Sequence, residues 1–143
     1  MENKSQLTAA PAGGTARALE RHLREAPKGT VLVIDDDDGI RVALAEILEL
    51  VGYQVAAAAD GQEAADLLAV GLAPSAIVLD LMMPRMDGWT FLASLRADVR
   101  YRDIPVVVTS SVATERPPGA DACLQKPFDV AQLEREVRRL CAH

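Results

Sequence analysis

Residues 76–88 have the sequence Ala-Ile-Val-Leu-Asp-Leu-Met-Met-Pro-Arg-Met-Asp-Gly, and this segment is the most informative about the fold. Four apolar residues lead directly to the carboxylate of Asp80, and two turn signals follow before a helical pattern begins. A short apolar run bounded in this way is typical of a strand buried in a parallel sheet. We therefore expect Asp80 at the carboxyl end of a strand, which is the edge where open α/β sheets bind ligands. Asp87 is better placed to cap the helix that follows.

The rest of the chain alternates between apolar runs and segments with helical periodicity. The other runs that predict strands are 30–34, 53–58, 104–109 and 120–124. Alternation of this kind indicates an α/β fold with a doubly wound parallel sheet. The segment between Ser111 and Ala122 is short for a crossover and contains Pro117-Pro118-Gly119, so we expect no full helix there.

Composition limits the class of protein. The chain has 143 residues, half of them apolar, which suffices for one domain with its own core. The domain is assigned to residues 29–143, and residues 1–28 are read as a flexible extension with room for a short helix at 15–25. The net charge of −6 disfavours nucleic acid and anionic membranes as partners. Two cysteines and no secretory signal favour a cytoplasmic location.

Four of the predicted strands end in polar side chains. They are Asp35 and Asp36, then Asp80, then Ser110, then Lys126. Because parallel strands share one carboxyl edge, these groups are expected to converge. Clustered carboxylates need a cation, and Mg²⁺ prefers such oxygen ligands, while a lysine and a hydroxyl can bind phosphoryl oxygens. The chemistry that fits is phosphoryl transfer onto Asp80.

Each of these residues also has an ordinary structural explanation. Asp37 and Asp38 are interpreted as a turn and helix cap rather than as ligands. Ser110 is explicable as a strand-end hydroxyl and Lys126 as a surface charge. Their joint occurrence at the ends of successive strands favours a functional site.

Three motifs make the chain resemble the receiver domain of two-component response regulators. They are Val31-Leu-Val-Ile-Asp-Asp36, Leu79-Asp-Leu-Met-Met-Pro-Arg-Met-Asp-Gly88, and Lys126-Pro-Phe128, with the strand ending at Ser110 between the last two. The resemblance covers about residues 29–142. It implies a flavodoxin-like sheet of five parallel strands in the order 2-1-3-4-5.

The resemblance also implies a role for each site residue. Asp80 would accept a phosphoryl group from a histidine kinase or phosphotransfer protein, and Asp35, Asp36, Asp80 and the backbone carbonyl of Met82 would hold Mg²⁺. Ser110 would be the switch hydroxyl and Lys126 the partner of the phosphate. The protein would not be an enzyme beyond its own phosphorylation and dephosphorylation. The peptide bond before Pro127 would be cis.

Two departures from the family pattern concern the output surface. Cys123 stands where the family usually has an aromatic switch residue, and the fourth helix is missing or a single turn. We therefore expect Leu124 and Val137 to be less shielded than in other receivers, on a face open to a partner or to self-association. No output domain is expected after His143, so the signal would pass through an unknown downstream protein.

The sequence is also compatible with two other functions. Asp36-Asp37-Asp38-Gly39 mimics the nucleophile loop of haloacid-dehalogenase-like phosphatases, although a cap region and the later acidic motif are missing. The altered output face would also suit a pseudo-receiver that binds a partner without being phosphorylated.

Overall fold

The computed structural model describes residues 28–83, 86–112 and 115–141. Within these residues five parallel strands form one sheet in the order β2-β1-β3-β4-β5. The strands are β1 (Thr30–Ile34), β2 (Gln54–Ala58), β3 (Ala76–Asp80), β4 (Val106–Ser110) and β5 (Ala122–Gln125). The helices of the same residues are α3 (Asp38–Leu50), α4 (Gly61–Ala69), α5 (Gly88–Ala97) and α6 (Val130–Cys141). The predicted fold class and strand order are confirmed, whereas the helix predicted at 15–25 lies outside the described residues.

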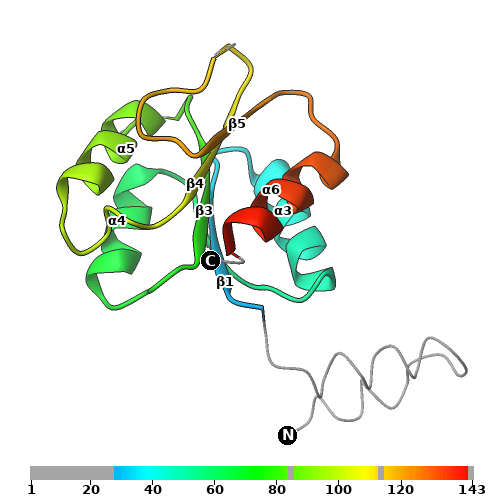
Figure 1. The fold of residues 1–143 in the computed structure, drawn as a ribbon, viewed down its shortest axis with the longest axis horizontal. Coiled ribbons are helices and arrows are strands. Elements are labelled where there is room, and N and C mark those ends of the chain that lie inside the picture. Colours follow the sequence, from blue (N-terminus) through cyan, green and yellow to red (C-terminus); the bar gives the residue numbers. More distant parts are fainter. Residues whose placement is uncertain (1–27, 84–85, 113–114, 142–143) are drawn as a thin grey trace, which may run out of the picture.

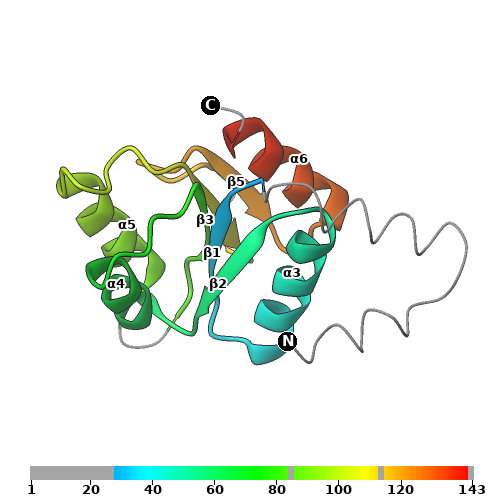
Figure 2. The same ribbon diagram turned by 90° about the horizontal axis from the view of Figure 1, so that it is seen from below.

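Helices cover both faces of the sheet. Helices α4 and α5 lie on one face, and α3 and α6 lie on the other (Figures 1 and 2). Alternate residues of each strand enter the two resulting cores, so that Leu32 and Ile77 pack toward α4 and α5 while Val33 and Val78 pack toward α3 and α6. A sheet buried on both faces requires continuous apolar strands, which explains the runs seen in the sequence.

Three helices begin at an aspartate, as their sequences predict. The carboxylates of Asp37, Asp60 and Asp87 each accept a hydrogen bond from the N–H three residues later, over 3.0, 2.9 and 2.8 Å. These bonds satisfy backbone donors that have no partner within the first helical turn. The caps lie at the carboxyl edge of the sheet, so the same aspartates help to define the loops around that edge.

The connection between β4 and β5 contains no helix in its described residues, 111–112 and 115–121, as the two prolines predicted. Arg96 of α5 holds the end of this connection. Its Nε donates to the carbonyl of Gly119 over 2.7 Å, and its Nη2 pairs with Asp121 Oδ2 at 3.0 Å. Gly119 has a φ of 90°, a conformation that glycine adopts at little cost.

The expected exposure of Leu124 and Val137 is wrong, because both side chains are buried. They belong to the core between the sheet and α3 and α6, whereas the helix-free connection packs through Ala120 against the opposite face. A missing helix on one face leaves the other face covered. Leu124 and Val137 therefore do not provide the exposed apolar surface on which a partner or self-association was expected.

Candidate functional site

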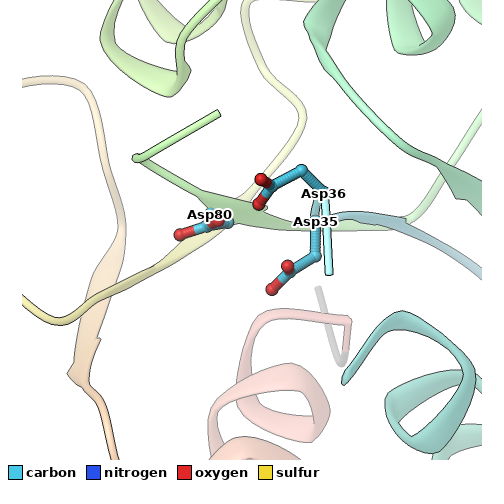
Figure 3. Close-up of side chains that lie close together, drawn as sticks. All are labelled: Asp35, Asp36 and Asp80. Carbon is cyan, nitrogen blue, oxygen red and sulfur yellow. The ribbon is translucent and has the colours of Figure 1, made fainter. Parts of the chain in front are cut away.

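Three carboxylates meet at the carboxyl edge of the sheet. Asp35 and Asp36 follow β1, and Asp80 is the last residue of the neighbouring strand β3. One oxygen from each carboxylate lies within 4.8 Å of the other two (Figure 3). Asp35 and Asp80 are buried, with exposed fractions of 2% and 4%, while Asp36 is exposed. The convergence predicted from the strand ends is therefore observed for the three carboxylates.

Asp35 is held by hydrogen bonds to its backbone and to its side chain. Its N–H donates to the carbonyl of Ala58 over 3.1 Å, and its Oδ1 accepts from the N–H of Asp37 over 2.9 Å. Its own carbonyl accepts a 2.8 Å hydrogen bond from Nη1 of Arg41. We did not single out Arg41 from the sequence, although its position three residues after Asp38 is the spacing of an ion pair at the start of a helix.

Lys126 brings a positive charge to the carboxylates. It directly follows β5, and its Nζ lies 3.3 Å from Asp35 Oδ2 and 3.5 Å from Asp80 Oδ1. Burial by itself would lower the pKa of Lys126, but the attraction of Asp35 and Asp80 outweighs burial and raises this pKa above 10.5. The lysine therefore stays charged and lies between the two buried carboxylates.

Asp80 holds its proton more tightly than an ordinary aspartate. Burial, followed by repulsion from Asp35, raises the pKa of Asp80 from 3.8 to about 6. The ammonium of Lys126 and the N–H of Met82, 3.4 Å from Asp80 Oδ1, act in the opposite direction. One lysine thus offsets only part of the cost of ionising this carboxylate.

Ser110 ends β4, the strand beside β3, and Gly88 lies against the backbone of Asp80. Ser110 is buried at the end of β4, its Oγ accepts a 3.0 Å hydrogen bond from the N–H of Val112, and its carbonyl accepts a 2.8 Å bond from the N–H of Lys126. A Cβ on Gly88 would lie 2.6 Å from the carbonyl oxygen of Asp80, so only glycine allows this approach. The Lys126–Pro127 peptide bond is cis, as the resemblance implied.

The arrangement matches a known family. Residues 31–138 match the response regulator receiver domain. The chain belongs to this family. It is 41% identical over 116 residues to the DNA-binding dual master transcriptional regulator RpaA and 39% identical over 120 residues to response regulator Rre1, both of Synechocystis sp.. These alignments cover 77% and 79% of this chain but 48% and 52% of the relatives, so the chain spans about half the length of the curated relatives it matches.

Solved receivers have the same fold. Response regulator protein TrrA from Thermotoga maritima, in complex with Mg(2+)-BeF, superposes with a TM-score of 0.70 at 27% identity, over 78% of this chain and 97% of that one. The resemblance to two-component response regulators is therefore confirmed. Receiver domains are signalling modules, and family membership removes the support for a dehalogenase-like phosphatase. No helix among the described residues has the length and apolar character needed to cross a membrane.

The expectation that nucleic acid is not a partner is wrong. It depended on the net charge of −6, whereas RpaA, a relative 41% identical to this chain, is named as a DNA-binding regulator. A net charge is a property of the residues over which it is summed, and it does not describe another domain of the same protein. The alignment covers 48% of RpaA, so a DNA-binding regulator can contain an acidic receiver.

Proposed function

We propose that this receiver accepts a phosphoryl group on Asp80 from a phosphohistidine of a histidine kinase or phosphotransfer protein, and that it signals through protein–protein contacts. The observation that carries the proposal is a buried carboxylate at the end of a central strand, beside two other carboxylates and one lysine. Family membership supports the kinase as the donor. The receiver unit is proposed to be residues 29–143.

The chain's own residues have distinct parts in this reaction. A carboxylate oxygen of Asp80 attacks phosphorus, and the bond between phosphorus and the histidine nitrogen breaks, with its electron pair remaining on the imidazole. Lys126 already lies 3.5 Å from Asp80, so a small movement of its flexible side chain would pair it with a phosphoryl oxygen. Ser110 is proposed to bond another phosphoryl oxygen, which would change its contact with Val112.

The carboxylates also fit a divalent cation. Three oxygen donors lie within 4.8 Å of one another, and Lys126 pairs with two of the carboxylates, those of Asp35 and Asp80. Oxygen-rich, partly open sites of this kind suit Mg²⁺. Asp35, Asp36, Asp80 and the backbone carbonyl of Met82 are the proposed ligands. Bound Mg²⁺ would neutralise the carboxylates and the charge on the transferred oxygens.

The proposal has two further parts. The protein catalyses only its own phosphorylation and dephosphorylation, because the group that reacts is its own aspartate. Its location is cytoplasmic, a proposal supported by the two free thiols, Cys123 and Cys141.

The test is mass spectrometry of the intact protein after incubation with acetyl phosphate and Mg²⁺. We expect a mass increase of one phosphoryl group that hydroxylamine removes, as it does from an acyl phosphate. Asp80→Asn should abolish the increase, whereas Asp103→Asn, an exposed aspartate in the loop before β4, should preserve it.

The alternative outcomes separate the remaining hypotheses. Labelling of Asp80→Asn at the wild-type rate would show that another residue is the acceptor. An unlabelled wild-type protein at saturating Mg²⁺ would instead support a pseudo-receiver that acts without phosphorylation.

A further inference from the structure

Arg41 lies one turn into α3, and its side chain reaches back toward the acidic site. Its Nη1 donates to the backbone carbonyl of Asp35 over 2.8 Å, and its Nη2 forms an ion pair with Asp38. The Arg41 side chain is 18% exposed, whereas that of Asp38 is 86% exposed. The guanidinium is thus held from the solvent side by Asp38 and is directed at the backbone between the two acids.

The hydrogen bond from Arg41 holds the peptide group that precedes Asp36. The peptide group that joins Asp35 to Asp36 is planar, so its carbonyl oxygen and the Cα of Asp36 turn together. Within the described part of the chain, no hydrogen bond holds the Asp36 carboxylate itself. Its position relative to Asp80 therefore depends on how the backbone around Asp36 is held.

The backbone is held on both sides of Asp36. Before it, the Asp35 carbonyl accepts from Arg41, and after it, the N–H of Asp37 donates to the Asp35 carboxylate over 2.9 Å. The four aspartates that follow β1, residues 35–38, therefore have different roles. Asp35 and Asp36 face the site, Asp37 caps α3 and Asp38 orients Arg41.

We propose that Arg41 is a positioning residue, which presets the Asp36 carboxylate by fixing the Asp35–Asp36 peptide group and thereby sets the affinity of the site for Mg²⁺. The inference rests on the proposed function of the same site. Residues that orient metal ligands from outside the ligand set change metal affinity by about 10- to 100-fold when they are replaced. Arg41 is not a ligand, because a guanidinium has only donors.

The sign of the effect distinguishes positioning from simple charge. Removing a cation that binds the backbone of the acidic site would by itself strengthen the binding of Mg²⁺. Removing a positioning group would weaken it, because the Asp36 carboxylate must then be ordered when the metal binds. Arg41→Met therefore gives opposite results under the two explanations.

The experiment is calorimetric titration of the full chain with MgCl₂. We expect Arg41→Met to weaken Mg²⁺ binding by about 10-fold or more. Asp38→Asn should weaken it less and in the same direction, because it removes only the group that orients Arg41. Arg138→Met, which breaks an exposed ion pair with Glu134 on α6, is the matched control and should leave the affinity unchanged.

A rate measurement separates positioning from general damage to the fold. With acetyl phosphate, Arg41→Met should be labelled more slowly than wild type at limiting Mg²⁺ and at about the wild-type rate at saturating Mg²⁺. A loss of rate that persists at saturation would show a structural defect and overturn the proposal.

The outcomes also separate this proposal from the function on which it rests. Wild-type binding of Mg²⁺ with unchanged or tighter binding in Arg41→Met overturns the role of Arg41 and leaves the proposed function standing. If Arg41→Met does not fold, Asp38→Asn decides, and an unchanged affinity there overturns the proposal. If wild type binds no Mg²⁺, both proposals fail.

Discussion

Replacing Asp80 by Asn should stabilise the metal-free protein at neutral pH. Burial and then the repulsion from Asp35 raise the pKa of Asp80 from 3.8 to about 6. The folded protein therefore binds this proton more tightly than the unfolded chain does. The stabilisation that results is fully present below about pH 4 and is lost as the pH rises through about 6. Asparagine has a similar shape and no charge, so the variant does not undergo this loss.

The size of the effect follows from the two pKa values. A difference of one pKa unit corresponds to about 1.4 kcal/mol, so a change from 3.8 to about 6 sets an upper limit of about 3 kcal/mol. Water at the sheet edge screens part of this energy, and asparagine also loses the ion pair with Lys126, whose Nζ lies 3.5 Å from Asp80. We expect Asp80→Asn to raise the free energy of unfolding by about 1 to 2 kcal/mol at neutral pH.

The assay is urea unfolding of both proteins with a chelator, from about pH 4 to about pH 8. Asp87 and Asp98 have lowered pKa values, caused mainly by hydrogen bonds from Thr90 and Arg100, and their contributions rise with pH in both proteins. The difference between the two unfolding free energies therefore isolates Asp80. A difference that stays constant with pH, or a variant less stable than wild type at neutral pH, would refute the reasoning.

Three further predictions concern stability. Mg²⁺ at about 100 times its dissociation constant should raise the wild-type free energy of unfolding by about 2.7 kcal/mol. Asp36→Asn should reduce this gain in stability. An equal gain in both proteins would argue against Asp36 as a ligand. Lys126→Met removes the cation shared by two buried carboxylates and should destabilise the metal-free protein by about 3 kcal/mol at neutral pH. The loss of stability should be smaller near pH 5, because one carboxylate takes up a proton there. A loss of stability that is independent of pH would contradict the pairing. Gly88→Ala places a Cβ 2.5 Å from the Cα of Leu81 and should lower stability by about 2 to 3 kcal/mol, so a variant with the wild-type melting temperature would disprove the close approach.

Local patterns in the sequence determine the elements and the edge at which the polar groups meet. Apolar runs that end in Asp35, Asp80 and Ser110 predicted buried strands, because a parallel sheet covered on both faces has no polar side. Pro117 and Pro118 predicted that no full helix connects β4 to β5, since proline lacks the backbone donor that a helix needs. These properties depend on neighbours along the chain, and for that reason they can be predicted from the sequence alone.

Contacts between distant segments are decided by the tertiary structure alone. Leu124 is buried because its side chain points to the face covered by α3 and α6, and a missing helix on the opposite face does not change that. The raised pKa of Asp80 depends on how deeply β3 is buried and on the distance to Lys126, 46 residues further along the chain. Burial and orientation are set by packing across the whole domain, and residue types and spacing along the chain do not contain that information.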